Sequence, residues 1–415
     1  MKAVALTGLG VVCCLGHEAA TITSAVRRQE HGLRPWEPAP GLPPRPAGLL
    51  PGFGLGAPSA HGWTWPGDLE IEPALIRQMP PHGVPVLVAA RNAFAEAGWS
   101  RDELANERTG LAVASPGSPR LIFHHLKALE TKGWRNPHPL GVLMGAPGGL
   151  AFTLAAHWGV KGPVGCHCTG CVSAAVALCQ AAEAVASGSA DRMIVAAGED
   201  LAAETFLPFD GLGALSRQAD PRLASRPFDA GRDGFVPAGG AAVLAVESLE
   251  SARARGLRPL AILRGWAQCG DGWHAVQPHP EGDGIGRAMK LAMENAGCET
   301  KDITYINAHA ASTPAGDRAE ASAILRLFGP GGPPVSSLKA LLGHCLNAAS
   351  GVELAVALRA LGEGFLPAQS HLVEVDPECA GLHLPREPLP FAGGLMLKNG
   401  VGFGGANVAL ILEIP

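Results

Sequence analysis

Residues 162–199 combine, in order, a cysteine-rich turn, an alanine-rich segment and an apolar run: GPVGCHCTGCVSAAVALCQAAEAVASGSADRMIVAAGE. Residues 172–187 have the composition of a helix, and Gly188 follows where a left-handed residue commonly ends one. The apolar run 192–198 is typical of a strand. This segment predicts a helix packed closely on a sheet, with Cys171 at the N-terminal edge of that helix.

The alternation of helix and strand continues along the rest of the chain. Further β-like runs lie at 5–12, 110–115, 241–247, 260–267, 305–310 and 407–414, and further helical stretches at 85–98, 284–296 and 317–328. The pattern predicts an α/β protein in which helices flank sheets. Residues 35–66 contain so much Pro and Gly that we expect a long surface excursion there, without regular structure.

Composition and charge exclude several classes of protein. The chain has 415 residues, of which 47% are hydrophobic and 17% charged, a balance typical of a globular protein and not of a disordered one. Gly8 and Gly10 interrupt the apolar N-terminus, and no long apolar window follows, so we expect a cytoplasmic protein without signal peptide or membrane span. The formal net charge of −5 provides no general attraction for nucleic acid or an anionic membrane.

The cysteine cluster at 166–171 is the first candidate for chemistry. A helix N-terminus favours the anionic form of a thiol, which predicts a lowered pKa and a nucleophilic role for Cys171. One alternative is a metal site built from Cys166, His167, Cys168 and Cys171, although no second Cys or His pair with matching spacing occurs. The other alternative is a purely structural cluster.

A nucleophilic cysteine needs partners that move protons and stabilise charge. His309 lies in YINAHAASTP at the end of a predicted strand, and His344 closes VSSLKALLGH, five residues after Lys339. His274, in GDGWH, is expected to be a loop histidine. Taken singly, His309 and His344 would also be structural more often than catalytic.

The ordered set of motifs resembles the elongating β-ketoacyl-[acyl-carrier-protein] synthases, or ketosynthases, of the thiolase-like superfamily. Besides the segments above, the motifs are LTGLGVVCCLG (6–16), FDGLGALS (209–216), RPFDAGRDGFV (226–236), NAH (307–309), KALLGH (339–344) and GFGGAN (402–407). They extend over essentially the whole chain, and VPAGG (236–240) is closer to the type I-like members of the family.

The resemblance implies a thiolase-like five-layered αβαβα architecture with two similar halves. Residues 1–250 would form the half that carries the nucleophile, and residues 251–415 the half that carries both histidines. It also implies a homodimer, or a heterodimer with a related ketosynthase-like subunit. An acyl carrier protein would be the partner that delivers phosphopantetheine, so no metal and no dissolved cofactor is expected.

The resemblance also implies a role for each residue at the centre of the reaction. Cys171 would take an acyl group from a carrier-protein thioester. His309 and His344 would assist decarboxylation of malonyl-carrier protein and stabilise the enolate oxygen. Lys339 would orient the surroundings of His309 and pair with Glu320, eleven residues after that histidine.

Phe403 and Thr313 complete the implied site. The backbone N–H groups of Cys171 and Phe403 would form an oxyanion hole, and Phe403 would gate the acyl pocket. Thr313 would contact phosphopantetheine, whereas Ala311 stands where the family has a second threonine. Val401 replaces an aromatic residue of the gate, and Gly170 replaces an alanine before the nucleophile.

The resemblance implies a decarboxylative Claisen condensation of malonyl-carrier protein with the Cys-bound acyl chain. These departures favour a specialised type II polyketide, polyene or fatty-acid pathway. One alternative is a chain-length-factor-like partner subunit, which the retained Cys171 and histidines disfavour. The other is an acyltransferase or cyclase that loads Cys171 without elongating the chain. The altered phosphopantetheine motif keeps this third function open.

Overall fold

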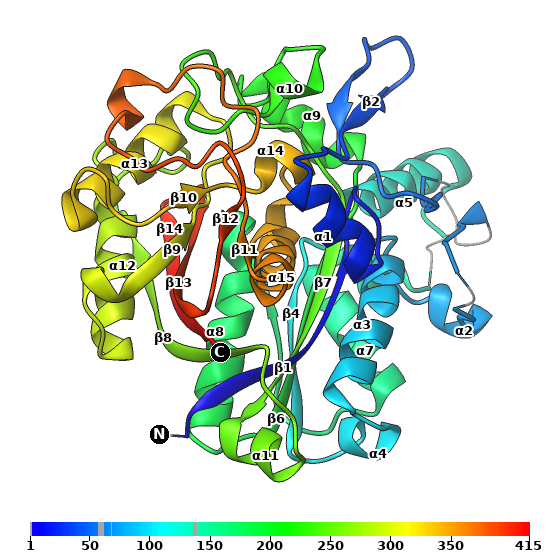
Figure 1. The fold of residues 1–415 in the computed structure, drawn as a ribbon. Helices are drawn as coiled ribbons and strands as arrows, with labels where there is room; N and C mark the ends of the chain where they lie inside the picture. Colours follow the sequence, from blue (N-terminus) through cyan, green and yellow to red (C-terminus); the bar gives the residue numbers. More distant parts are fainter. Residues whose placement is uncertain (1, 57–61, 68, 136–138) are drawn as a thin grey trace.

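The computed structural model describes residues 2–56, 62–67, 69–135 and 139–415. A ten-stranded sheet runs through the molecule in the order β10-β9-β13-β14-β8-β1-β7-β6-β4-β5 (Figure 1). Its strands are β1 (Val4–Val12), β4 (Thr109–Ala114), β5 (Val164–His167), β6 (Arg192–Glu199), β7 (Gly240–Ser248), β8 (Ala261–Gly270), β9 (Ile303–Asn307), β10 (Val335–Ser336), β13 (Gly394–Gly402) and β14 (Ala406–Ile414).

The sheet consists of two halves with the same topology. Starting from β1, the order is β1-β7-β6-β4-β5, and starting from β8 it is β8-β14-β13-β9-β10. In both halves each of the first three strands is antiparallel to its neighbour, and the last three strands are parallel. The halves join where Val4–Leu6 pairs with Ala261–Leu263. The boundary expected at residues 250 and 251 lies in helix α11 (Leu249–Ala254).

Helices cover both faces of each half and form a shared layer between them. The six main helices are α3 (Gly83–Ala97), α7 (Pro147–Trp158), α8 (Ser173–Ala186), α12 (Asp283–Ala296), α13 (Pro314–Phe328) and α15 (Ala349–Gly362). α8 and α15 lie between the half-sheets, α3 and α7 cover the outer face of one half, and α12 with α13 covers the other (Figure 1). These are the five alternating layers that the resemblance implies.

Small residues allow the layers to approach closely. A Cβ on Gly10 of β1 would lie 1.8 Å from the carbonyl oxygen of Ala89 in α3, and one on Gly8 would lie 2.1 Å from that of Ala93. Between the half-sheets, a Cβ on Gly351 of α15 would come within 3.2 Å of the Cβ of Ala174 in α8. The glycines that interrupt the apolar N-terminus are therefore contact positions of a buried strand.

The predicted helices and strands agree with the structure to within a few residues. The largest difference is the 305–310 run, of which only the part up to Asn307 is strand. The expectation of no regular structure over 35–66 is partly wrong, because β2 (Arg34–Trp36) pairs antiparallel with β3 (Arg45–Ala47). Pro35 stands opposite Pro46 there, as an edge ribbon tolerates. Residues 57–61 of that segment lie outside the described residues.

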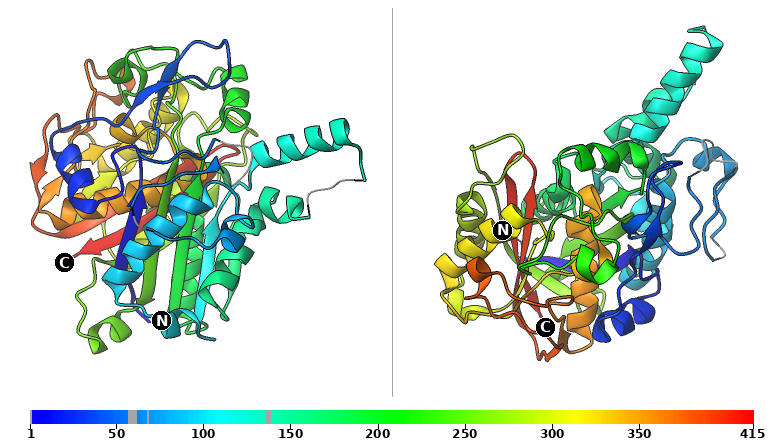
Figure 2. Two further views of the ribbon diagram at one scale, coloured as in Figure 1. Left: turned by 90° about the vertical axis from the view of Figure 1, so that its right-hand side faces the viewer. Right: turned by 90° about the horizontal axis from the view of Figure 1, so that it is seen from above.

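Shorter elements complete the fold. They are α1 (Ala19–Arg27), α2 (Pro73–Ile76), α4 (Arg101–Leu104), α5 (Pro119–Lys132), α6 (Gly141–Gly145), α9 (Ala203–Gly211), α10 (Pro221–Ala224), α14 (Lys339–Leu342), β11 (Phe365–Leu366) and β12 (Leu389–Pro390). Helix α5 projects away from the layered body (Figure 2).

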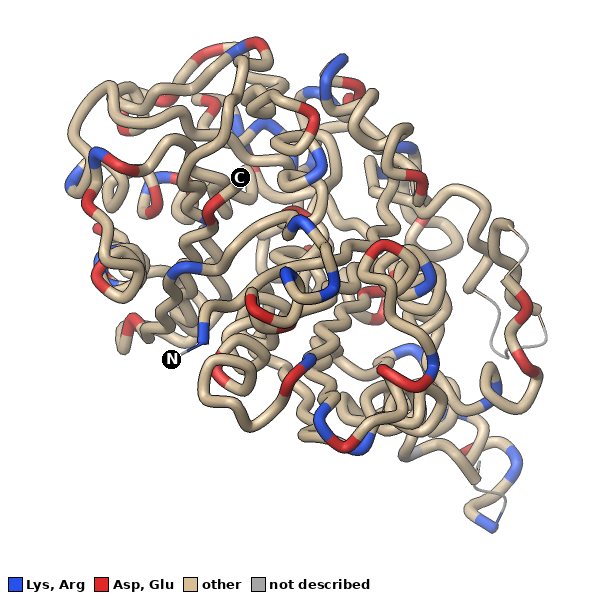
Figure 3. The backbone as a smooth tube through the Cα atoms, turned by 60° about the horizontal axis from the view of Figure 1, so that its bottom comes forward, with Lys and Arg blue, Asp and Glu red and all other residues tan. Residues whose placement is uncertain are grey.

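Basic and acidic residues are interspersed along the backbone, in keeping with the small net charge (Figure 3). Across the described ranges, no helix is long and apolar enough to cross a membrane.

Candidate active site

Cys171 lies in a single 3₁₀ turn, Gly170–Val172, that leads directly into helix α8. The Thr169 N–H donates to Ser173 Oγ at 2.8 Å, and that oxygen lies 2.8 Å from Asn347 Oδ1. Gly170 has a φ of +62°, which a glycine adopts without steric cost. These contacts hold the turn so that the Cys171 thiol sits at the entrance to the buried helix, as the sequence predicts.

The structure brings both predicted histidines to the same centre as Cys171. His344 Nε2 lies 3.1 Å from Cys171 Sγ, although 173 residues separate the two in sequence. The rings of His309 and His344 meet edge to face, with centroids 5.3 Å apart. The edge of β9 thus presents His309, while the turn after α14 presents His344.

Lys339 is also at this centre, but its carboxylate partner is not the predicted one. Its Nζ lies 2.5 Å from Glu353 Oε1, and it donates to the carbonyl oxygen of His309 and toward His309 Nδ1 at 3.4 Å. The predicted pairing of Lys339 with Glu320 is therefore wrong. Glu353 projects from the middle of α15, which passes directly beneath the site, and this places its carboxylate against Lys339.

Glu320 instead anchors the backbone that carries His309. It accepts hydrogen bonds from the N–H groups of His309 at 2.9 Å and Ala310 at 2.7 Å, and from Asn399 Nδ2 at 2.9 Å. Hydrogen bonds to a charged acceptor are stronger than neutral ones, so Glu320 fixes the position of the histidine.

Two site residues were missed in the sequence. Lys398 is buried on β13 and donates to the second carboxylate oxygen of Glu353 at 2.7 Å, so Glu353 bridges Lys398 and Lys339. The signal for Glu353 was present, because it is the one charged residue in the apolar run ASGVELAVAL (349–358). A lone carboxylate on such a helix needs a buried partner.

Two buried lysines, Lys339 and Lys398, and two buried carboxylates, Glu353 and Glu320, lie around the histidines. Burial, followed by Lys339, lowers the pKa of both His309 and His344 well below the usual range. Both histidines are therefore neutral near pH 7. Because Lys339 donates toward His309 Nδ1, the remaining proton of that ring belongs on Nε2.

The predicted lowering of the Cys171 thiol pKa is wrong. Burial raises the pKa of Cys171 to about 12, against a smaller opposing effect of Lys339. The single turn of 3₁₀ helix does not compensate for the loss of solvent around the sulfur. The resting residue is a neutral thiol whose proton faces a neutral histidine, which is a base poised to remove it.

A cavity of about 300 Å³ opens onto these residues. Its lining includes Cys171, both histidines, Thr313 and Phe403. Phe403 occupies the tight turn between β13 and β14, and its ring lies 5.4 Å from that of Phe209. A Cβ on neighbouring Gly402 would lie 3.6 Å from the Cys171 nitrogen, so the turn passes close to the nucleophile's backbone N–H. The loop thus places the predicted gate at the mouth of the cavity.

The other side chains of the 166–171 cluster do not share a partner with Cys171. Cys166 Sγ lies 3.1 Å from the Pro147 carbonyl oxygen, His167 Nε2 lies 2.6 Å from Gln180 Oε1, and Cys168 is exposed. Within the described part of the chain, no group of three or more His, Cys, Asp or Glu side chains could hold a metal ion. The alternative of a metal site at this cluster has no support in the geometry.

A cysteine nucleophile beside two neutral histidines, in two topologically equivalent α/β halves, defines a carbon–carbon condensing enzyme of the acyltransferase class. Comparison with known families makes the assignment specific. Residues 1–252 match the beta-ketoacyl synthase N-terminal domain, and residues 260–373 match the C-terminal domain of the same family. The chain belongs to the β-ketoacyl synthase family, which confirms the resemblance found in its sequence.

Individual relatives support the same assignment. The chain is 33% identical over 422 residues to 3-oxoacyl-[acyl-carrier-protein] synthase 2 of Staphylococcus aureus strain COL, covering 99% of this chain and 98% of the relative. A beta-ketoacyl synthase from Burkholderia phymatum STM815 superposes with a TM-score of 0.89 at 32% identity, over 100% of both chains. The ishigamide ketosynthase/chain length factor superposes with a TM-score of 0.87 at 26% identity, over 100% of this chain and 99% of that one. These matches confirm the thiolase-like α/β fold.

Proposed function

We propose that this enzyme is a β-ketoacyl-acyl-carrier-protein synthase that performs a decarboxylative Claisen condensation. The observation that carries the proposal is the 3.1 Å contact between His344 Nε2 and Cys171 Sγ, inside a cavity that His309 also lines. Acyl transfer requires a nucleophile with a base in hydrogen-bond reach, and condensation requires a donor for an enolate oxygen. The proposed centre supplies both.

In the acylation step, His344 accepts the thiol proton while Cys171 Sγ attacks the carbonyl carbon of an acyl thioester. The backbone N–H groups of Cys171 and Phe403 stabilise the oxyanion of the tetrahedral intermediate. The carbon–sulfur bond to the carrier's phosphopantetheine then breaks, and His344 returns the proton to the departing thiolate. The acyl group remains on Cys171 as a thioester.

In the condensation step, malonyl-carrier protein loses CO₂, and the electron pair of the broken carbon–carbon bond becomes an enolate. His309 Nε2–H donates to the enolate oxygen, and His344 is the second donor once its proton lies on Nε2. The enolate carbon attacks the acyl carbon, and the bond to Cys171 breaks as a thiolate leaves. The thiolate takes up one proton from solvent by way of His344. Lys339 and Glu353 hold His309 in position for this contact.

Phosphopantetheine would arrive on an acyl carrier protein, so the enzyme would need no cofactor of its own. Thr313 lies in the cavity lining beside His309 and supports contact with that arm. Ala311 is buried near the nucleophile and offers no hydroxyl. We therefore propose that the arm is held by fewer hydrogen bonds than the family pattern provides.

A second subunit is the other proposed partner, and a copy of this chain is the first candidate. The projecting helix α5 exposes Ile122, Phe123 and Leu126, and Val164 is exposed on β5 at the open edge of the sheet. Exposed apolar residues on a projecting helix and an unpaired strand at a sheet edge are each typical of an interface. A related ketosynthase-like subunit would satisfy the same surface in a heterodimer.

We place the enzyme in the cytoplasm and in a specialised polyketide, polyene or fatty-acid pathway. All ten cysteines are free, which supports a reducing compartment. The changes at Ala311, Val401 and Gly170 support a specialised substrate.

The decisive experiment is mass spectrometry of the protein after incubation with a panel of acyl-carrier-protein thioesters, in parent, Cys171→Ala and Cys168→Ala forms. An adduct that disappears only in Cys171→Ala, together with labelled CO₂ release from malonyl-carrier protein, is the expected result. An adduct without CO₂ release would favour the non-elongating acyltransferase. Absence of any adduct would favour the partner-subunit function.

A further inference from the structure

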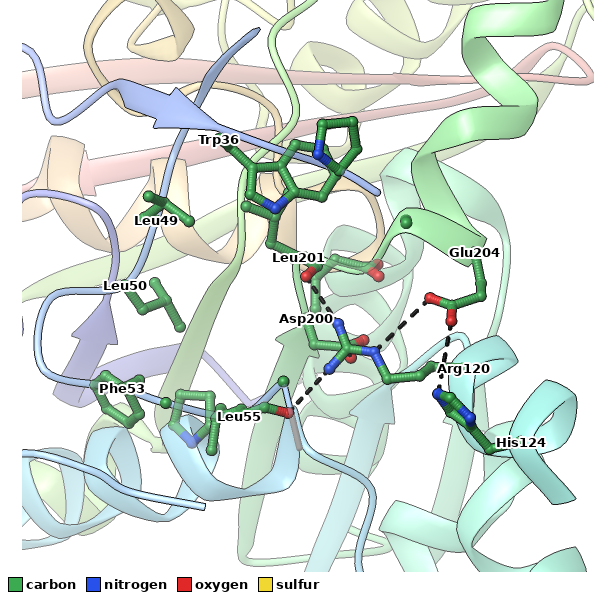
Figure 4. Close-up of a pocket in the computed structure, with 16 residues that line it drawn as sticks. Trp36, Leu49, Leu50, Phe53, Leu55, Arg120, His124, Asp200, Leu201 and Glu204 are labelled. Carbon is green, nitrogen blue, oxygen red and sulfur yellow. Dashed lines mark hydrogen bonds and ion pairs between the residues drawn. The ribbon is translucent and has the colours of Figure 1, made fainter. Parts of the chain in front are cut away.

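A second cavity of about 390 Å³ has two chemically different sides (Figure 4). Trp36, Leu50 and Phe53 form an apolar side, whereas Arg120 and Asp200 belong to a polar side. The polar side also includes Glu204 and His124, whose side chains lie 3.9 Å apart. A cavity of this kind suits an amphipathic molecule.

The cavity and the nucleophile adjoin the same buried cluster of side chains. Trp36 and Leu201 line the cavity, and both also pack against the buried cluster that contains Cys171 and Phe206. The rings of Trp36 and Phe206 meet edge to face, with centroids 6.4 Å apart. An acyl chain on Cys171 would have to pass between these side chains to reach the cavity.

The polar side contains a carboxylate that the protein itself does not satisfy. Asp200 is only 4% exposed, and neither carboxylate oxygen has a hydrogen-bond partner among the described residues. Arg120 Nη2 lies 3.7 Å and His82 Nδ1 3.9 Å from this carboxylate, and the buried Glu199 also lines the cavity. The guanidinium of Arg120 donates instead to the carbonyl oxygens of Leu55 and Leu201, each at 2.9 Å. A buried acceptor left in this state favours a ligand that brings a hydrogen-bond donor.

We propose that this cavity receives the distal end of the acyl chain held on Cys171, and that Asp200 selects chains whose end carries a hydroxyl or amino group. The inference rests on the proposed function, because it requires an acyl group on the nucleophile. The apolar side, with Trp36 and Phe53, would hold the methylene part of the chain, and Asp200 would accept from its terminal donor. The substrate class is thus an acyl chain with a polar end rather than a plain hydrocarbon chain.

The test compares matched carrier-protein thioesters of equal length that end in a methyl or a terminal hydroxyl group, over lengths from two to sixteen carbons. Transfer to Cys171 is followed by mass spectrometry in the parent, Asp200→Asn and Asp200→Leu proteins. We expect the parent to transfer the hydroxyl-ended chain roughly tenfold faster at lengths that reach the cavity, and equally fast at two carbons, which is too short to reach it. Asp200→Asn should reduce the preference, and Asp200→Leu should abolish or reverse it.

Asp102→Asn is the matched control, because Asp102 is an exposed carboxylate on α4. It should keep the parent's preference. Equal transfer of both chain types by the parent at every length, or a preference that survives Asp200→Leu, would overturn the inference while leaving the proposed function intact. Failure of even the two-carbon donor to acylate the parent would instead contradict the proposed function. Asp200→Asn conserves shape, so it keeps the test valid if the leucine variant does not fold.

Discussion

At the scale of single residues, the active site depends on burial of its ionisable groups. Burial raises the pKa of Cys171 to about 12 and lowers that of His344 well below the usual range, so the neutral forms of both are favoured. The proton then moves from sulfur to nitrogen only when a thioester is attacked. This arrangement protects the thiol from reaction without substrate.

The pH dependence of thiol alkylation tests this view. With a pKa of about 12, the thiolate fraction of Cys171 should rise about tenfold per pH unit throughout the range from 6 to 10. The alkylation rate, followed by peptide mass spectrometry, should therefore show no plateau below pH 10. A plateau near neutral pH would indicate a lowered pKa and restore the view that the helix N-terminus activates the thiol.

The pH dependence of acyl transfer tests the lowered pKa of His344. Because the pKa of His344 in the folded protein is well below 6.5, the imidazole stays in its basic, neutral form at pH 6.5. It becomes protonated only when the pH falls to the lowered pKa. Stopped-flow transfer rates should therefore change little between pH 7.5 and 6. A threefold or larger decrease over this interval, at constant fold by circular dichroism, would contradict the assignment of a lowered pKa.

Two buried glutamates have different roles beside Lys339 and His309, and a pair of variants tests them. Glu353→Gln would leave Lys339 and Lys398 without their shared counter-charge, so we expect a loss of about 3–5 kcal/mol in the free energy of unfolding. Glu320→Gln keeps an acceptor for only one of the two N–H groups, because His309 and Ala310 donate to separate oxygens, and it should cost about 1–3 kcal/mol. Urea unfolding measures both, and a larger loss in the Glu320 variant would reverse the assigned roles.

At the scale of elements, close packing of α3 on β1 depends on glycine. Gly10→Ala places a methyl group where 1.8 Å separates it from the Ala89 carbonyl oxygen, so strand or helix must shift. We expect a loss of about 2 kcal/mol or more in the free energy of unfolding. Gly270→Ala, at the end of β8 with no atom within 4 Å of the added carbon, is the matched control and should be nearly neutral. Equal effects in urea unfolding would show that packing is not the cause.

At the scale of the whole molecule, we expect a second subunit to bury the exposed apolar residues of α5. The double variant Phe123→Asp with Leu126→Asp should convert a dimer into a monomer, because it places two charges on the proposed interface. Light scattering after size exclusion measures the mass. Leu291→Asp, on the exposed face of α12, is the control and should leave the mass unchanged. A parent protein that is monomeric at micromolar concentration would contradict a homodimer.

By itself, the sequence determined the local elements and the family. Hydrophobic periodicity and glycine signals act over a few residues, and for that reason the predicted bounds of α8 and β6 needed little correction. The motif around Cys171 and those of His309 and His344 identified the residues that meet at the centre.

Which charges meet, and which groups lose their solvent, depends on the packing of segments that are far apart in the sequence. Lys339 pairs with Glu353 rather than Glu320 because α15 runs beneath the site, a placement that depends on packing between two half-sheets. The same packing buries Cys171 and raises its pKa, reversing an expectation drawn from helix position alone. The equivalence of the two halves is likewise visible in strand order and not in any repeat of residues, because backbone topology survives when side chains change.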